Sequence, residues 1–191
     1  LLNYHKEILG FIASGFVEVI STNDVRDGVS ILHYLRHRPV MQPHKNTKMR
    51  PVFNASFGSP SLNDCLHTGE NHVPLMWDVL QRIRLWKYMV TADIRKAFLH
   101  LRLDPRDRDL LRFLWVEDPL AELLTFRHLR WIVVMFGATC SPAQLQATLE
   151  LHVSRYVEEY PRTTALLARD RFVDDLATGA DTREEAMKIA V

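Results

Sequence analysis

The hexapeptide Arg171-Phe172-Val173-Asp174-Asp175-Leu176 is the most informative stretch of this chain. Its two adjacent carboxylates lie between apolar residues, and a third carboxylate, Asp93, follows a short apolar run about eighty residues earlier. A carboxylate that leaves an apolar strand is costly unless a positive group meets it. Three converging carboxylates suit the two-metal arrangement that promotes phosphoryl transfer. The sequence therefore predicts a divalent-metal site formed by Asp93, Asp174 and Asp175.

Length and composition are those of an ordinary globular protein. The 191 residues are 47% hydrophobic and 25% charged, which allows one or two units with a core and argues against disorder. The net charge is only +1, but no acidic residue lies between Asp27 and Asp64, an interval that holds five Lys or Arg and three His. Local positive charge of this kind suits phosphates, although a solvated basic loop gives the same pattern.

Cysteine content and hydropathy bear on location. Cys65 and Cys140 are the only cysteines and lack metal-site spacing, so a reducing, intracellular location is expected rather than a disulfide framework. The longest apolar run, residues 131–140, is too short to span a bilayer. Because the chain starts at Leu1 rather than Met and stops inside an apparent helix, we expect it to be part of a longer protein.

Apolar spacing, glycines and prolines predict a mixed order of helices and strands. Helices are expected at residues 4–15 and 75–86, from Ser141 onward, and near the end of the chain, where Asp181 or Thr182 should cap the last helix. Strands are expected at residues 16–20, 34–42, 48–56, 88–93, 111–116, 123–131, 171–173 and 176–178, of which 88–93 should be buried. Ser141 and Gln144 should form a capping box. Since the order lacks βαβ regularity, the predicted fold class is α+β with an antiparallel sheet.

Several ordered motifs resemble those of reverse transcriptases. They are TADIRKAF (residues 91–98), FGATCSPAQ (136–144) and FVDD (172–175). The resemblance extends to TKMRPVFNAS (47–56), SLNDCL (61–66) and DRDLLRFLW (107–115), which are most similar to the Bel–Pao class of LTR retrotransposon polyproteins. It covers nearly the whole chain and is strongest over residues 34–186. Agreement of several motifs in order is much harder to obtain by chance than any one of them.

The resemblance implies a catalytic role for the three carboxylates. Asp93, Asp174 and Asp175 would hold two Mg²⁺ ions, for which Mn²⁺ can substitute, and Val173 would touch the primer end. The implied activity is that of an RNA-directed DNA polymerase, which transfers a nucleotide from a dNTP to a primer 3′ hydroxyl on an RNA or DNA template. A cytoplasmic particle is the implied location, with no membrane partner.

The resemblance also implies nucleotide contacts. Arg50 would grip the triphosphate together with Lys48, because an arginine fork can hold phosphate oxygens bidentately. Phe98 would stack under the incoming sugar and exclude a 2′ hydroxyl, which favours dNTPs. Phe136 and Gly137 would pack against the nucleotide and template. Many retroviral relatives have Gln in place of Phe136, so apolar packing must replace a polar contact there.

The implied architecture is a polymerase palm with an antiparallel sheet plus a fingers subdomain. Residues 1–85 would be mainly fingers, residues 86–103 and 141–191 mainly palm, and residues 104–140 a return to the fingers. The thumb, RNase H and integrase regions would belong to the rest of a polyprotein.

Two alternatives stay open. One is a non-catalytic nucleic-acid-binding remnant of a retroelement, and the other is a palm polymerase that makes RNA, against which Phe98 argues. A zinc site at His33 and His37 is not expected, because no third ligand is evident.

Overall fold

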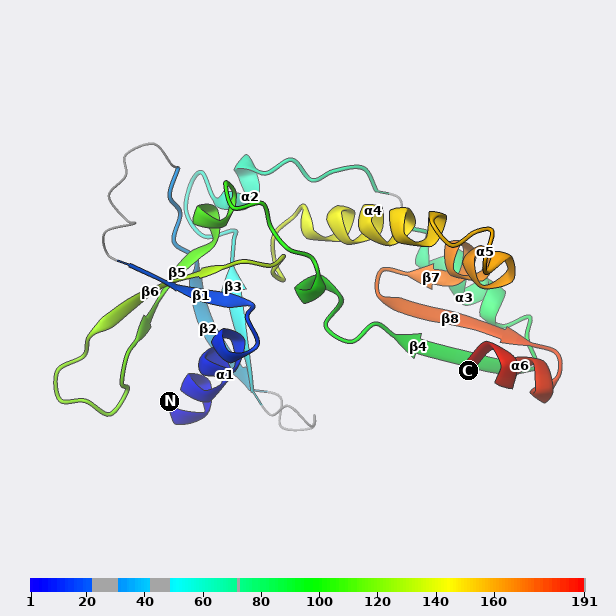
Figure 1. Ribbon diagram of the computed structural model, residues 1–191, viewed down its shortest axis with the longest axis horizontal. Helices are drawn as coiled ribbons and strands as arrows, with labels where there is room; N and C mark the ends of the chain where they lie inside the picture. Colours follow the sequence, from blue (N-terminus) through cyan, green and yellow to red (C-terminus); the bar gives the residue numbers. More distant parts are fainter. Residues whose placement is uncertain (22–30, 42–48, 72, 191) are drawn as a thin grey trace. The chain divides into compact units, whose positions relative to one another are not determined.

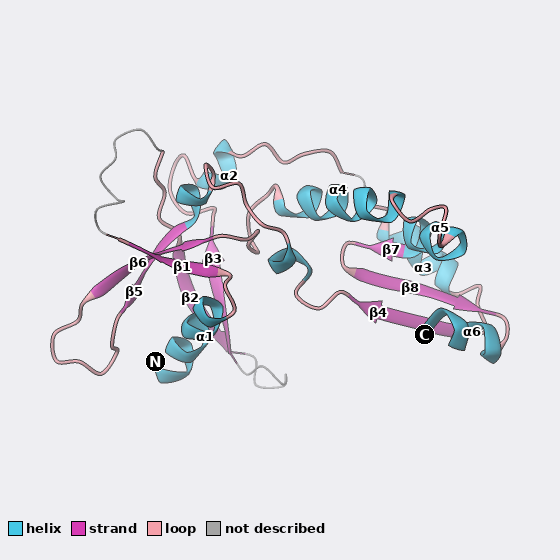
Figure 2. Cartoon of the chain, viewed as in Figure 1, coloured by secondary structure: helices cyan, strands magenta, loops and turns pink. Residues whose placement is uncertain are grey.

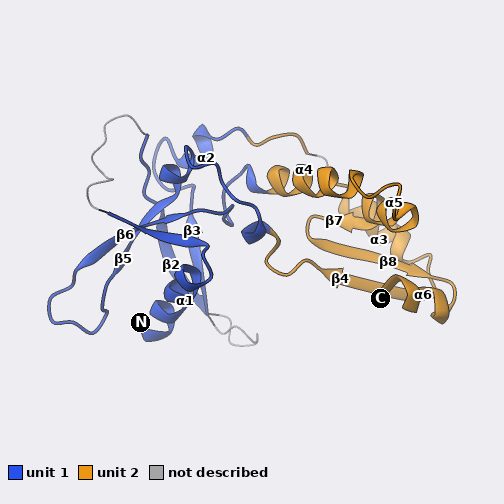
Figure 3. Ribbon diagram, viewed as in Figure 1, with its two compact units in different colours: residues 1–67, 98–141 blue, residues 68–97, 142–191 orange. Residues whose placement is uncertain are grey.

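The computed structural model describes residues 1–21, 31–41, 49–71 and 73–190 (Figure 1). These residues form helices and antiparallel sheets, as an α+β class requires (Figure 2). The chain divides into two compact units (Figure 3). Unit 1 comprises residues 1–67 and 98–141, and unit 2 comprises residues 68–97 and 142–191. The assignment of chain segments to fingers and palm stays a prediction.

Unit 1 contains a three-stranded sheet in the order β1–β6–β5 and a separate hairpin, β2–β3. All the strand pairs within these sheets are antiparallel. The described elements of this unit are α1 (Leu2–Ala13), β1 (Val17–Ile20), β2 (Arg36–Met41), β3 (Met49–Asn54), α2 (Leu62–Cys65), the 3₁₀ helices η2 (Ala97–His100) and η3 (Arg108–Leu111), β5 (Arg112–Val116) and β6 (Phe126–Trp131).

The core of unit 1 is an aromatic cluster. Phe53 of β3 lies edge-on to Phe113 and Trp131, with ring centroids 4.9 and 5.1 Å apart. All three rings are buried, and edge-to-face pairs of this kind add about 0.5–1.5 kcal/mol each beyond the area they bury. The cluster therefore joins the hairpin to the sheet.

His37 belongs to this core and not to a metal site. Its Nε2 donates to the Leu114 carbonyl oxygen at 3.0 Å, so its Nδ1 accepts from the Tyr4 hydroxyl at 2.5 Å. Burial lowers the pKa of His37, opposed by the Leu114 hydrogen bond. With both ring nitrogens engaged, the imidazole has no lone pair to offer a metal ion.

Unit 2 is built on a three-stranded sheet in the order β4–β8–β7. Helices α3 and α5 pack on β7 and β8, and α6 packs on β4 and β8. α3 belongs to unit 2 through those contacts. The described elements are α3 (Met76–Ile83), β4 (Tyr88–Asp93), α4 (Ser141–Ser154, whose first residue is counted in unit 1), α5 (Pro161–Asp170), β7 (Arg171–Phe172), β8 (Asp175–Ala180) and α6 (Arg183–Ala190).

Two local predictions are wrong. β4 is not buried: only Val90 is half-buried and Met89 is 64% exposed, because among the described strands β4 pairs with β8 alone. The capping box at Ser141 does not form, since Ser141 is already helical and its hydroxyl donates to the Met135 carbonyl at 2.8 Å. Of the two candidate caps for the last helix, Asp181 and Thr182, the structure shows Thr182: the amide of Glu185 donates to its hydroxyl at 3.3 Å.

Two further features concern the length of the described helices and the state of the cysteines. None of these helices combines the length and the apolar character that crossing a membrane requires. Cys65 and Cys140 are both free thiols.

Candidate carboxylate site and basic groove

The β4–β8 ladder places two of the predicted carboxylates opposite each other. The two strands run antiparallel from Tyr88↔Ala180 to Asp93↔Asp175. Directly opposed residues in such a ladder project from the same face, with Cβ atoms about 5 Å apart. Asp93 and Asp175 are both exposed, so the ladder presents a pair of carboxylates to solvent at one end of the sheet of unit 2.

The third carboxylate is supplied by the turn between β7 and β8. Phe172 pairs with Asp175, which leaves Val173 and Asp174 as the two turn residues. The amide of Ile94 donates to the Asp174 carbonyl at 2.9 Å and so ties the turn to the residue after Asp93. Unit 2 therefore brings together all three residues that the sequence predicted as catalytic.

Val173 gives this turn an unusual backbone. Its φ is 54°, a left-handed value that costs an L-residue roughly 1–2 kcal/mol and is rare for a β-branched side chain. Strain of this size persists only where the surrounding structure imposes it, and it is frequent at functional sites. Here the β7–β8 ladder and the Ile94 hydrogen bond fix the turn from both sides.

The electrostatics of the site favour a cation. The pKa of Asp174 is raised, first by burial and then by the neighbouring charges of Asp175 and Asp93, against a lowering by its own backbone amide. Repulsion among carboxylates is relieved by a bound positive ion, and oxygen ligands suit Mg²⁺.

The carboxylates lie close together but do not form a ready-made cage. Within the described ranges, no three His, Cys, Asp or Glu side chains are already arranged to hold a metal ion. Asp93 and Asp175 are exposed and Asp174 is half-buried, so at least two of the carboxylates can rotate toward a shared cation. The donor set therefore fits Mg²⁺ in chemistry and in access.

The other predicted site residues belong to unit 1. Arg50 is exposed on β3, where it pairs with Val40 of β2. Lys48 lies outside the described residues. Phe98, in η2, is half-buried and meets Phe136 edge-on, with ring centroids 5.2 Å apart and planes at 67°. Phe136 is 55% exposed, so this pair presents an aromatic edge at the surface of unit 1.

The backbone conformation at position 137 requires a glycine. Its φ is +98°, and a Cβ placed there would lie 3.1 Å from the Phe53 carbonyl oxygen. The Asn63 side chain holds the same loop, because its Nδ2 donates to the Gly137 carbonyl at 3.0 Å and its Oδ1 accepts from the Thr139 amide at 2.9 Å. Sequence reasoning missed Asn63, since a single Asn in a short helical turn has no pattern that points to a distant loop.

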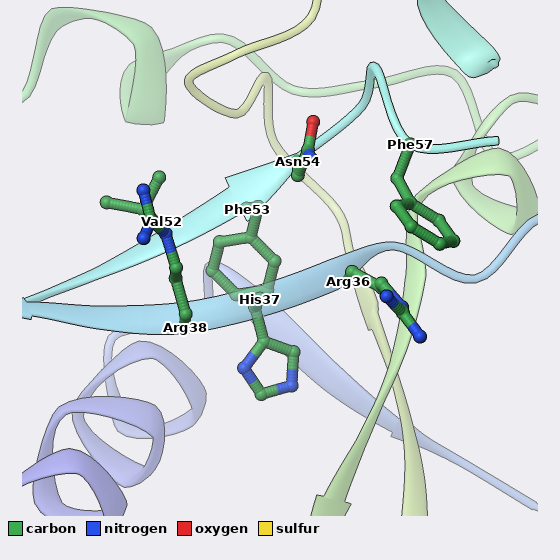
Figure 4. Close-up of a pocket in the computed structure, with 7 residues that line it drawn as sticks. All are labelled: Arg36, His37, Arg38, Val52, Phe53, Asn54 and Phe57. Atoms are coloured by element: carbon green, nitrogen blue, oxygen red, sulfur yellow. The ribbon is translucent and has the colours of Figure 1, made fainter.

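Unit 1 also contains a groove of about 670 Å³ on the β2–β3 hairpin (Figure 4). We call it the basic groove; it is lined by Arg36, His37, Arg38, Val52, Phe53, Asn54 and Phe57. Arg36 pairs with Asn54 and Arg38 with Val52, so these four side chains share one face of the hairpin. The Arg36 guanidinium lies over the Phe57 ring, 3.8 Å from its centroid.

The lining of the basic groove is cationic and partly aromatic. It contains two arginines and no carboxylate among the described residues. Guanidinium forks bind phosphate oxygens, and aromatic or guanidinium planes stack with bases. The basic interval noted in the sequence thus contributes to a concave surface.

Comparison with known proteins leaves the family open. Neither a scan of protein-family models nor a search of curated proteins finds a match to this chain. The function must therefore be argued from the residues and their arrangement.

Proposed function

We propose that this chain is the fingers and palm region of a reverse transcriptase, similar to those of Bel–Pao class LTR retrotransposon polyproteins. Unit 2 would be the catalytic palm and unit 1 the fingers. The observation that carries the proposal is the pairing of Asp93 with Asp175 in the β4–β8 ladder, with Asp174 in the adjoining turn. Adjacent carboxylates at a hairpin tip are common; their pairing with a third carboxylate from a distant strand is not.

The proposed reaction is nucleotidyl transfer from a dNTP to the 3′ hydroxyl of a primer on an RNA or DNA template. Asp93, Asp174 and Asp175 would hold two Mg²⁺ ions, which supply activation of the hydroxyl and charge stabilisation at the leaving oxygens. By holding these ions the carboxylates would also orient the reacting groups, and orientation would lower the barrier in addition to charge stabilisation.

Unit 1 would supply the nucleotide contacts. Arg50 is an exposed guanidinium on β3, suited to bidentate contact with triphosphate oxygens. Phe98 would exclude ribonucleotides, since its ring is held against Phe136 and cannot easily move aside for a 2′ hydroxyl. Phe136 and Gly137 would contact the nucleotide and template.

The basic groove favours a second candidate function, that of a nucleic-acid-binding remnant without catalysis. Arg36, Arg38 and Phe57 could hold a single strand through phosphates and stacking whether or not the carboxylates bind metal. Binding of this kind is tolerant of sequence and weakens steeply with salt.

Primer extension tests the catalytic proposal. The purified chain is incubated with a primed RNA template and dNTPs in Mg²⁺ or Mn²⁺, beside an Asp174→Asn variant of equal volume. We expect extension by the wild type and a loss of about a thousandfold in the variant, equivalent to roughly 4 kcal/mol of transition-state stabilisation.

Strand binding separates the two functions. The wild type and Asp174→Asn should bind a fluorescent single strand with affinities that agree within about twofold, as measured by fluorescence anisotropy without dNTP. A wild type that binds the strand tightly and extends no primer with either cation supports the remnant and contradicts the polymerase.

A further inference from the structure

Unit 2 also contains an ionic cluster centred on the buried carboxylate of Asp170, the last residue of α5. Asp170 is 0% exposed, and its two carboxylate oxygens accept from Nε and a terminal nitrogen of Arg169 at 2.8 and 2.7 Å. Arg82 of α3 approaches the same carboxylate with its Nε at 3.3 Å. A second nitrogen of Arg82 donates to the Arg169 carbonyl at 2.7 Å. The charge of Asp170 is thus compensated by two guanidinium groups.

A fourth contact connects this cluster to the hairpin. The Thr178 hydroxyl donates to Oδ2 of Asp170 at 2.7 Å, and Thr178 is 0% exposed. Asp170 immediately precedes β7, whereas Thr178 is in β8. The bond therefore closes the base of the hairpin whose tip carries Asp174 and Asp175.

That closure matters because β7 is short. Only Arg171 and Phe172 pair with β8, so few backbone hydrogen bonds hold the strand that leads into Asp174. Thr178, in contrast, lies inside the β4–β8 ladder, the one that pairs Asp93 with Asp175. The Asp170–Thr178 hydrogen bond thus links β7, which leads to Asp174, to β8, the strand that pairs Asp93 with Asp175.

We propose that Asp170 is a positioning residue that, through Thr178, sets where the Asp174 carboxylate lies relative to Asp93 and Asp175. This inference rests on the proposed function, because it treats the three carboxylates as a cation site. Asp170 touches neither substrate nor cation in this proposal; it acts through the geometry of the hairpin. Groups that hydrogen-bond metal ligands directly change metal affinity by about tenfold to a hundredfold when they are removed, and we expect the lower end of that range for a bond that acts through the hairpin.

Thr178→Val is the variant that isolates this bond. It keeps the volume and branching of the side chain and removes only the hydroxyl, while Arg82 and Arg169 still compensate the charge of Asp170. Thr178→Ser retains the hydroxyl and should keep the Mn²⁺ affinity of the wild type. Thr164→Val is the matched control, since Thr164 is a buried threonine of unit 2 whose hydroxyl donates to the Tyr160 carbonyl at 2.9 Å, at the other end of α5.

The measurement is Mn²⁺ affinity of the full chain, read from the free-ion electron paramagnetic resonance signal without dNTP or primer. We expect Thr178→Val to weaken Mn²⁺ binding by about tenfold, and Thr178→Ser and Thr164→Val to stay within about twofold of the wild type. Circular dichroism at the same temperature verifies that each variant is folded. Should Thr178→Val not fold, Arg82→Gln replaces it, because Arg82 is at the partly exposed edge of the cluster; weakening by more than about threefold is expected there.

The outcomes separate this inference from the proposed function. A folded Thr178→Val, or Arg82→Gln in its place, with wild-type Mn²⁺ affinity overturns the positioning role, and so does equal weakening by Thr164→Val. Asp174→Asn serves as the reference for the cation site itself. If the wild type binds no Mn²⁺, or binds it as well as Asp174→Asn does, the cation site and the positioning role are both rejected.

Discussion

Phe98 is the single residue on which the choice between deoxyribonucleotides and ribonucleotides is expected to depend. Its ring is half-buried and meets Phe136 edge-on, so a neighbouring side chain supports it. A supported ring resists displacement by a 2′ hydroxyl, whereas a smaller side chain leaves room for that group. The proposal of a DNA-synthesising enzyme rather than an RNA-synthesising one rests on this residue.

We predict that Phe98→Val raises the ratio of kcat/KM for rNTPs to kcat/KM for dNTPs by at least about tenfold, because one steric contact is worth about 1–3 kcal/mol in discrimination. Single-nucleotide incorporation on one template measures both values. Phe98→Tyr, which keeps the ring, should leave the ratio within about threefold. Equal use of both nucleotides by the wild type would show that Phe98 is not the gate.

Val173 shows what sequence cannot predict at this scale. The sequence predicted two short strands on either side of Asp174-Asp175, whereas the turn is at Val173-Asp174 and Asp175 is already in β8. The left-handed φ of Val173 also runs against the preference of a β-branched residue. The turn must fit between a ladder on one side and the Ile94 amide on the other. Those constraints come from distant parts of the chain, so no local pattern records them.

Among the elements, β8 is the central strand of the unit 2 sheet, and at Gly179 its neighbours approach too closely for a side chain. A Cβ on Gly179 would lie 2.4 Å from the Tyr88 carbonyl oxygen and 2.6 Å from the Trp86 Cβ. The first of these contacts is with backbone, which cannot swing away. Only glycine allows β8 and β4 to stay in the register that pairs Asp93 with Asp175.

We predict that Gly179→Ala lowers the free energy of unfolding by about 1–3 kcal/mol, the usual cost of overpacking a close contact. Gly10→Ala is the matched control: Gly10 is inside α1, and a Cβ there meets nothing within 4 Å. Because alanine is the better helix former, Gly10→Ala should raise stability by about 0.5–1 kcal/mol. Urea unfolding measures the change in unfolding free energy for both variants, which should be negative for Gly179→Ala and positive for Gly10→Ala. A Gly179→Ala variant as stable as the wild type would contradict the close approach.

The elements themselves were largely predictable, and the exceptions have a common cause. Prolines, glycines and apolar spacing located four of the described helices and the strands to within a few residues, but they missed α2 and α5. The burial of β4 was predicted wrongly because an apolar run is the same in a central strand and in one with a single described partner. Pairing is a property of the sheet, so it could not be inferred from residues 88–93 alone.

At the scale of the whole molecule, buried ion pairs make stability depend on pH. Burial raises the pKa of Asp170, but hydrogen bonds from Arg169 and Thr178 and the charges of Arg169 and Arg82 together outweigh it and hold the pKa below its usual value. Hydrogen bonds from Arg130 and Arg112 likewise outweigh burial and lower the pKa of Asp109 in unit 1. A carboxylate with a lowered folded-state pKa stabilises fully above its unfolded pKa of about 3.9, and this contribution is lost as pH falls through the folded value.

We therefore predict that the chain is stable to acid down to about pH 4 and loses unfolding free energy progressively below it. Asp170→Asn should lower stability by about 2 kcal/mol at pH 6, because a buried carboxylate that accepts charged hydrogen bonds is lost to the exposed Arg169 and the half-buried Arg82. The variant should also lose less stability than the wild type between pH 5 and pH 3. Urea midpoints of the wild type and Asp170→Asn, measured from pH 5 to pH 3, test this difference. If the two midpoints fell in parallel with pH, Asp170 would not be a source of the acid sensitivity.

The candidate site was predictable in part for a physical reason. Carboxylates at strand ends carry their own signal, since they are costly without a cation, and the structure brings Asp93, Asp174 and Asp175 together within unit 2. The residues that support the site carry no such signal. Asp170, Thr178 and Asn63 look like ordinary polar residues until the fold shows which groups they bind.

The central claim is that three carboxylates from β4 and the β7–β8 hairpin share bound cations. Anomalous diffraction from crystals soaked in Mn²⁺ tests it most directly, with Asp174→Asn crystals treated identically as the reference. We predict Mn²⁺ density within coordination distance, about 2.0–2.6 Å, of carboxylate oxygens from both Asp93 and Asp174, and its loss in the variant. Well-ordered crystals in which Mn²⁺ binds elsewhere, or binds only one of these two carboxylates, would contradict the claim.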